Sequence, residues 1–164
     1  MANPDSKDIF SLTHDDMVQV FIDQHRQMLL SCTGGLSEAE ARLKLVESKT
    51  TLLGLVKHAI FVERVWFGEA ATGRSRAELG IASSPSKSFD LEASDTIDSI
   101  RHEYAHAIEL SHQAVEGKTG DDVFSGNRRG PLPLRWIQLH MLRELAQHCG
   151  HADILREQIL AARK

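Results

Sequence analysis

The sequence lacks a cysteine pattern, a long apolar run and a secretory signal, each of which would indicate a particular class of protein. Only two of the 164 residues are cysteines, Cys32 and Cys149, and they stand far apart with no CxxC spacing. Neither a disulfide scaffold nor a thiolate zinc finger is indicated. No apolar run approaches the ~18 residues of a membrane span, so we expect no membrane partner. Residues 1–7 lack the features of a secretory signal, and we expect a cytoplasmic protein.

An excess of positive charge is also missing. The chain has 19 lysines and arginines against 23 acidic residues, for a net charge of −4. The largest basic cluster is the pair Arg128 and Arg129, so we expect no nucleic-acid partner. With 41% hydrophobic and 26% charged residues, the composition is typical of a globular protein, and the length suits one domain spanning residues 1–164.

The alternation of polar and apolar residues that indicates strands is absent too, whereas helical periodicity is clear. The pattern predicts an all-α, four-helix bundle with a long loop, residues 74–92, between the second and third helices. A loop of that length is suited to covering a site. The expected long helices are 13–31, with Met17, Val20, Phe21, Gln24 and Met28 on one side, then 51–71, 94 or 95 to 116, and 133 to the C-terminus. A short helical turn with a capping box is expected from Ser37 to Glu40.

Glu144 and His148 are the most informative residues of the last helix. They belong to a stripe of eight positions that spans roughly 80° of the helix face at about 100° per residue. The other members are Leu134, Ile137, Met141, Ala152, Leu155 and Ile159. Burying an ionised carboxylate without a partner costs several kcal/mol, so such a group is paired, protonated or bound to a metal. The spacing i, i+4 lets both side chains converge on one ion.

His58 in the second helix is the best candidate for a third ligand, because it shares its face with Leu55, Val62 and Val65. Two imidazoles and one carboxylate leave a coordination position open, as in catalytic zinc sites. The sequence therefore predicts a divalent metal held by His58, Glu144 and His148. Zinc is the first expectation, and nickel, iron or manganese would accept the same ligands.

Simpler interpretations of these residues stay open. Glu144 could pair with an arginine such as Arg26 or with His148 alone, and His148 could be a hydrogen-bonded core histidine. His151 could be a ligand, a neighbour of the ligands or a surface residue, and His140 is expected outside the ligand set. Cys149 is expected to be a small buried residue, and Trp66 and Trp136 are expected to pack in the core or at a helix end.

A competing motif, residues 102–106 (HEYAH), matches the HExxH pattern of zinc proteases, and His112 stands at the offset of a third ligand. The helix argues against it. Ile97, Ile100, Tyr104, Ile108 and Val115 define the expected buried face, and His102 and His106 lie roughly 140–180° from its centre. We expect both histidines to face water, so a protease site is disfavoured.

The segments that carry these features resemble the DinB-like superfamily along nearly the whole chain. They are residues 51–58 (TLLGLVKH), 63–67 (ERVWF), 134–140 (LRWIQLH) and 148–156 (HCGHADILR), with Glu144 between the last two. The branch that includes mycothiol-dependent maleylpyruvate isomerase is the most similar, and the bacillithiol-linked S-transferases are more distant. The resemblance implies a four-helix bundle, a homodimer in many members, and a metal held by one ligand from the second helix and two from the last.

Many DinB-like proteins use three histidines, and this sequence departs from that pattern at Glu144. The isomerase branch is similar in its His, Glu, His set, which corresponds to His58, Glu144 and His148. The resemblance implies a metal-dependent enzyme that uses a low-molecular-weight thiol such as mycothiol for S-transfer to, or isomerisation of, a small electrophile. A stress-response or binding protein with a non-catalytic metal site is the alternative, and a metal-dependent hydrolase is the third.

Overall fold

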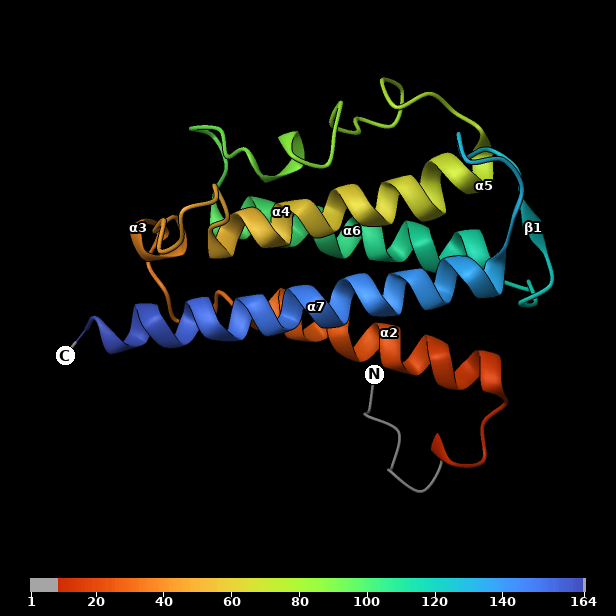
Figure 1. The fold of residues 1–164 in the computed structure, drawn as a ribbon, viewed down its shortest axis with the longest axis horizontal. Coiled ribbons are helices and arrows are strands. Elements are labelled where there is room, and N and C mark those ends of the chain that lie inside the picture. Colours follow the sequence, from red (N-terminus) through yellow and green to blue (C-terminus); the bar gives the residue numbers. More distant parts are fainter. Residues whose placement is uncertain (1–8, 164) are drawn as a thin grey trace.

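The computed structural model describes residues 9–163 and confirms the predicted all-α bundle (Figure 1). The four long helices are α2 (His14–Ser31), α4 (Leu52–Glu63), α6 (Ile97–Val115) and α7 (Leu134–Ala161). Helix α2 packs along α7, while α4 contacts both α6 and α7. None of the helices in this described part is long and apolar enough to cross a membrane. Residues 1–7, expected to carry no secretory signal, lie outside the described residues.

Local capping groups set most of the helix ends where the sequence predicts them. Thr13 accepts a hydrogen bond from the Asp16 backbone N–H at the start of α2, and a capping box of Ser37 and Glu40 starts α3 (Glu38–Ala41). Helix α6 begins at Ile97, later than predicted, because Thr96 is its N-cap. These signals involve residues close in sequence, so the sequence alone reveals them.

The second predicted helix, 51–71, is continuous but contains an unpredicted π-helical turn. It comprises α4, the π-helical turn η1 (Arg64–Glu69) and α5 (Ala70–Thr72), and ends at Gly73 with φ 67°. Every residue of α4 except Lys57 is buried. Because α6, α7 and the following loop all pack against α4, His58 is enclosed.

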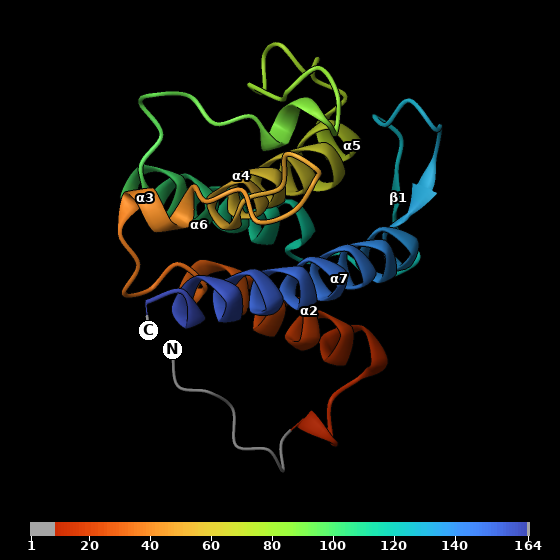
Figure 2. The same cartoon turned by 60° about the vertical axis from the view of Figure 1, so that its left-hand side comes forward.

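The long loop after α5 lies along the outside of α4, and both ribbon views show it there (Figure 2). Its one regular turn, the 3-10 helix η2 (Lys87–Phe89), contacts α4. The predicted long loop is therefore confirmed, and it lies over the helix that carries His58.

A small antiparallel ladder near the start of α7 was not predicted. Its strands, β1 (Val123–Phe124) and β2 (Leu132–Pro133), have two residues each, too few for an alternating pattern. The turn between them packs closely on α5: the Gly126 N–H donates to the Ala70 carbonyl at 2.9 Å. A Cβ at Gly126 would lie 2.2 Å from the Glu69 carbonyl oxygen, so only glycine fits there.

The face predicted for the first helix is wrong. Phe21 and Met28 are 40% and 44% exposed, whereas the buried positions of α2 are Val18, Ile22, Arg26 and Leu29. The true buried stripe contains an arginine, so a search for apolar residues at helical spacing selects the neighbouring face instead.

Candidate metal centre

The three predicted ligands come together between α4 and α7. One ligand-type atom from each of His58, Glu144 and His148 lies within 4.8 Å of the other two. His58 is 5% exposed, and the side chains of His148 and Glu144 are 13% and 27% exposed. The site is therefore closed on the α4 side and open beside Glu144.

The loop over α4 fixes the orientation of the His58 ring. Ser88 Oγ lies 2.6 Å from the Pro85 carbonyl oxygen and 2.6 Å from His58 Nδ1. A carbonyl only accepts, so the single hydroxyl proton of Ser88 goes to Pro85 and His58 Nδ1 must donate to Ser88. His58 Nε2 then keeps its lone pair. The Phe89 ring stacks on His58 with centroids 4.1 Å apart and holds the ring plane.

This arrangement is the one metal-ligating histidines usually have, in which the second ring nitrogen donates to a protein oxygen. Burial, together with His148 nearby, lowers the pKa of His58 to about 4. The ring is therefore neutral at pH 7, as a metal ligand must be.

Glu144 and His148 lie at the edge of the buried face of α7, not at its centre. The six apolar members of the predicted stripe are all buried, but the buried face also extends the other way to Gln138, Leu145 and Cys149. An edge position explains the partial exposure of the two ligands. It also leaves room for a further group to reach the site.

No lysine or arginine pairs with Glu144 among residues 9–163; its ionic neighbours are two histidines. The alternative that Arg26 pairs with Glu144 is wrong, because Arg26 is bound to Glu63 and Asp23. His148 Nε2 stands 3.6 Å from Glu144 Oε2, beyond hydrogen-bonding distance. Among residues 9–163 the buried His148 Nδ1 has no hydrogen-bond partner, so His148 is not fully hydrogen-bonded as a core histidine would be. The alternative in which Glu144 and His148 pair only with each other stays open.

His140 lies on the other side of Glu144 and has a defined tautomer. The Arg143 guanidinium donates to His140 Nδ1 at 2.8 Å, so the ring proton is on Nε2, which faces Glu144 Oε1 at 3.8 Å. Burial lowers the pKa of His140. The ring stacks on Trp136, with centroids 5.1 Å apart, and makes an edge contact with the buried Trp66. Trp66 therefore packs in the core, whereas Trp136, which is 37% exposed, packs on His140 near the start of α7.

The contact with His148 lowers the pKa of Glu144 below its ordinary value, and the neighbouring His140 ring acts in the same direction, although partial burial opposes this. A carboxylate that stays ionised supplies the negative charge that a divalent cation needs. These three groups fit a divalent metal. His58 offers a lone pair on Nε2, His148 Nδ1 has no hydrogen-bond partner among residues 9–163, and the Glu144 carboxylate is ionised with no lysine or arginine partner there.

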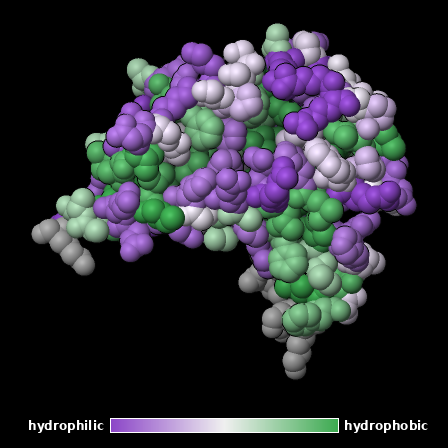
Figure 3. All heavy atoms as spheres, viewed as in Figure 1, coloured by the Kyte–Doolittle hydropathy of each residue, from purple (hydrophilic) through white to green (hydrophobic). Residues whose placement is uncertain are grey.

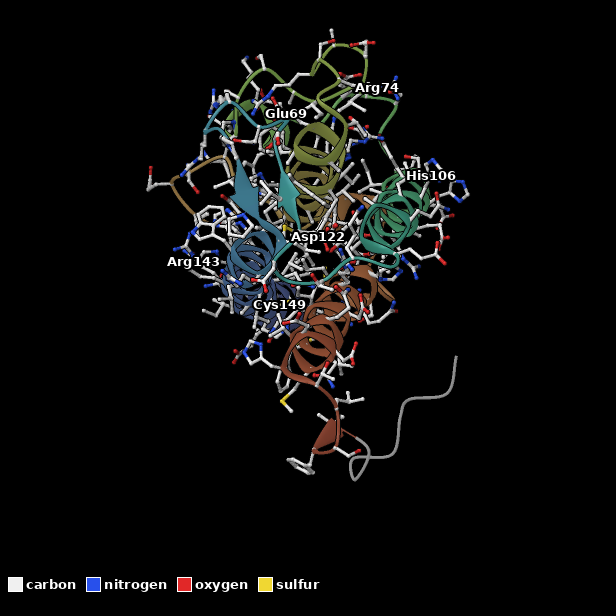
Figure 4. The ribbon with its side chains drawn as sticks, turned by 90° about the vertical axis from the view of Figure 1, so that its right-hand side faces the viewer. Glu69, Arg74, His106, Asp122, Arg143 and Cys149 are labelled. Atoms are coloured by element: carbon white, nitrogen blue, oxygen red, sulfur yellow. The ribbon has the colours of Figure 1, made fainter. Side chains whose placement is uncertain are left out.

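The competing histidines are not part of this cluster. His102 and His106 are exposed on α6 as predicted, and Figure 4 shows His106 pointing away from the bundle. His112 binds Asp23 at 2.8 Å. His151 is exposed, with its ring centroid 5.7 Å from that of His148, and is not one of the three grouped ligands. Cys149 is buried and its thiol donates to the His25 carbonyl, as expected of a packing residue.

Three residues that support the site were not predicted in these roles. Ser88 and Phe89 orient His58 from the loop, and Arg143 fixes the tautomer of His140. Nothing in the local sequence indicates the roles of Ser88 and Phe89, because the loop must fold back to bring Ser88 to His58, 30 positions earlier. Arg143 stands only three positions after His140, and this helical spacing could have indicated their contact.

A four-helix bundle with a His, Glu, His cluster on its second and last long helices defines a DinB-like candidate metalloprotein. The family model for mycothiol-S-transferase matches residues 17–161, so the chain belongs to that family. The resemblance to the DinB-like superfamily is thereby confirmed. A comparison with curated protein sequences found no match.

Proposed function

We propose that the protein is a metal-dependent S-transferase that joins a small electrophile to the sulfur of a mycothiol-like thiol. The observation that carries the proposal is the cluster itself: three ligand-type side chains within 4.8 Å, no lysine or arginine partner for Glu144 among residues 9–163, and one open side. Membership in the mycothiol-S-transferase family supports both the thiol and the class of reaction.

In the proposed reaction the thiol loses its proton to solvent, and its sulfur attacks the electrophilic carbon. A carbon–sulfur bond forms, while the bond from that carbon to the leaving group breaks and the leaving group departs with the electron pair. A divalent ion held by His58, Glu144 and His148 would favour the thiolate over the thiol at neutral pH. We propose zinc for this role, with nickel or iron as the other candidates.

The side chains of the chain itself have distinct tasks. His58, oriented by Ser88 and Phe89, presents Nε2 to the site without rotation of its ring. The Nε2 proton of His140 faces Glu144 and helps to keep that carboxylate ionised. Because the ligands are positioned before substrate arrives, little reorganisation is needed when the thiol enters.

The experiment measures metal content by mass spectrometry in protein purified without a chelator or histidine tag, and thioether formation from mycothiol and chlorodinitrobenzene. We expect about one ion per chain and thioether product, both lost in Glu144→Ala and His148→Ala. His102→Ala, which removes an exposed histidine outside the cluster, is the matched control and should keep both.

Each other outcome selects a different function. Equal, negligible metal in all variants, even after reconstitution, leaves a helical binding protein. Metal without thioether indicates the stress-response or binding alternative. If an isomerisable substrate reacts while the thiol is regenerated, the enzyme is an isomerase, because transfer consumes the thiol.

A further inference from the structure

A cavity of about 310 Å³ opens between the segment before α4 and the C-terminal half of α7. It is lined by Val46, Ser48, Thr50, His151, Ile154 and Leu155. None of the metal-ligand candidates lines it, so it is distinct from the candidate metal centre. Its volume is at the lower end of the range for small-molecule sites.

The cavity lies along α7 on the C-terminal side of His148. His151 lines the cavity, and its ring centroid is 5.7 Å from that of His148. Ile154 follows His148 by six residues, which is about 9 Å along the helix. A compound in the cavity would thus have its near end within one helical turn of His148 and its far end about two turns away.

The lining has no charged carboxylate, lysine or arginine. Val46, Ile154 and Leu155 supply aliphatic surface, and Ser48 and Thr50 supply hydroxyl groups. Ser48 Oγ donates to Thr50 Oγ1 at 3.0 Å, which leaves the Thr50 hydroxyl proton free for a ligand. This chemistry suits an uncharged, largely apolar compound with one small hydrogen-bond acceptor.

The aliphatic side chains at the mouth are unusually exposed. Ile154 is 57% exposed and Val46 is 41% exposed, and the nearby Leu43 and Leu45 are 40% and 37% exposed. Figure 3 shows hydrophobic side chains gathered over α3 and the segment that follows it. An exposed apolar cluster around a cavity is typical of a ligand site, because a bound apolar group would remove that surface from water.

The opposite side of Glu144 has a different chemistry. There Arg129 lies over the Trp66 ring at 5.8 Å, and Arg143, on the outer side of α7 in Figure 4, binds His140. Neither guanidinium pairs with a carboxylate in the part of the chain that the structure describes, so an anionic compound would be expected on this side.

We propose that the cavity beside His151 binds the uncharged, apolar part of the electrophile and directs its reactive carbon toward the metal centre. This inference rests on the proposed function, because only that function makes the bound compound an electrophile. The binding preference of the cavity, however, can be tested without turnover.

The first test uses dinitrobenzene, which lacks the leaving group and cannot react. It is titrated into methyl-labelled protein free of metal and thiol, and NMR shifts are followed. We expect shifts at the methyls of Val46, Ile154 and Leu155. Ile154→Trp fills the cavity and should weaken binding roughly tenfold or more. Leu139→Trp changes another exposed position of α7, 51% exposed and outside the lining, and should bind like wild type.

Absence of shifts up to the solubility limit, shifts at other methyls, or equal binding by both tryptophan variants would each overturn the proposal. The second test compares neutral chlorodinitrobenzene with anionic chlorodinitrobenzoate as electrophiles for mycothiol. We expect a lower KM for the neutral compound, and Ile154→Trp should raise that KM with little change in kcat.

The two measurements separate the two proposals. A preference for the benzoate would place the electrophile beside Arg129 and Arg143 and contradict the inference. Methyl shifts in the cavity without thioether from either compound would support a neutral-ligand site while contradicting the proposed transfer reaction. Thioether formation without binding in the cavity would support the proposed S-transferase function and contradict the proposal that the cavity binds the electrophile.

Discussion

Helix α4 contributes to two polar clusters inside one bundle, and only one of them is complete. Toward α2 and α6, Glu63 accepts two hydrogen bonds from Arg26, at 2.8 and 2.7 Å, and one from Ser111, at 2.6 Å. Toward α7, His58 meets Glu144 and His148 with no hydrogen bond among the three.

The comparison separates a structural cluster from a binding site. Arg26 and Glu63 are 1% exposed each, and the charge of each is neutralised by the other. Within the described part of the chain, the metal-centre cluster leaves a buried imidazole nitrogen unpaired and a carboxylate without a lysine or arginine partner. We propose that a group from outside the chain completes the second cluster, whereas the charges of the first cluster are paired within the chain.

Breaking the complete cluster should have the largest effect on stability. Glu63→Ala leaves the buried Arg26 guanidinium with Asp23 at its outer edge, and we expect a loss of about 3–5 kcal/mol in the free energy of unfolding. Glu144→Ala, measured in metal-free protein, should change it by less than about 1 kcal/mol, since no strong contact is lost. Urea unfolding with a chelator present measures both.

The double variant Arg26→Met with Glu63→Leu is the control for this prediction. It removes both charges, so no buried charge is left without a partner. Its free energy of unfolding should therefore be closer to that of wild type than the value for Glu63→Ala is. If Glu144→Ala proves as destabilising as Glu63→Ala without metal, the contrast between a complete and an open cluster is wrong.

Zinc should make the Glu144→Ala variant much less stable relative to wild type in a thermal or urea assay. At free zinc of about 100 times the Kd, the wild type should gain about 2.7 kcal/mol, because the ion binds only the folded site. Glu144→Ala should gain nothing. His112→Ala, which alters the first cluster beside Asp23, should gain as much as wild type. An equal gain in all three would indicate that zinc binds elsewhere.

The same comparison explains what sequence analysis could and could not predict. His58, Glu144 and His148 were predicted because each is a polar residue within a helix whose apolar periodicity is clear. Arg26 was considered as a partner for the wrong carboxylate. Its true partner, Glu63, is 37 residues away, and only the packing of the whole bundle brings the two side chains together.

The wrong face of α2 has the same cause. With Arg26 counted as a surface residue, the buried stripe of Val18, Ile22 and Leu29 has a gap in the middle. One signal could have corrected this: Glu63 stands within a run of buried apolar residues of α4 and needs a cation. A buried carboxylate in one helix therefore predicts a buried cation on the face of another.

A smaller effect is expected when the support of His58 is removed. Ser88→Ala removes the acceptor for His58 Nδ1, and zinc affinity should fall about 10–100-fold. Ser86→Ala, an exposed serine of the same loop, is the matched control. Nitrogen NMR of metal-free protein gives a second readout: the His58 ring should carry its proton on Nδ1 in wild type and shift toward Nε2 in Ser88→Ala. If zinc affinity is unchanged although the His58 tautomer changes, Ser88 orients the His58 ring without contributing to metal binding.

The smallest effect concerns the outer edge of the complete cluster, where Asp23 meets Arg26 and His112. Partial burial raises the pKa of Asp23, but hydrogen bonds from His112 and Arg26 lower it more, so the folded pKa lies below its ordinary value. Asp23 therefore contributes stability that is present above the pKa of the unfolded chain and is lost as pH falls through the folded pKa.

The stability difference between wild type and Asp23→Asn should accordingly be constant from neutral pH to about pH 4 and disappear below it. It should stay small, since the Asp23 side chain is 39% exposed and solvent screens its charge. Asp153→Asn, an exposed position of α7, is the control in urea unfolding across this pH range. A difference that instead grows as the pH falls would mean that Asp23 is protonated in the native state and that the complete cluster ends at Glu63.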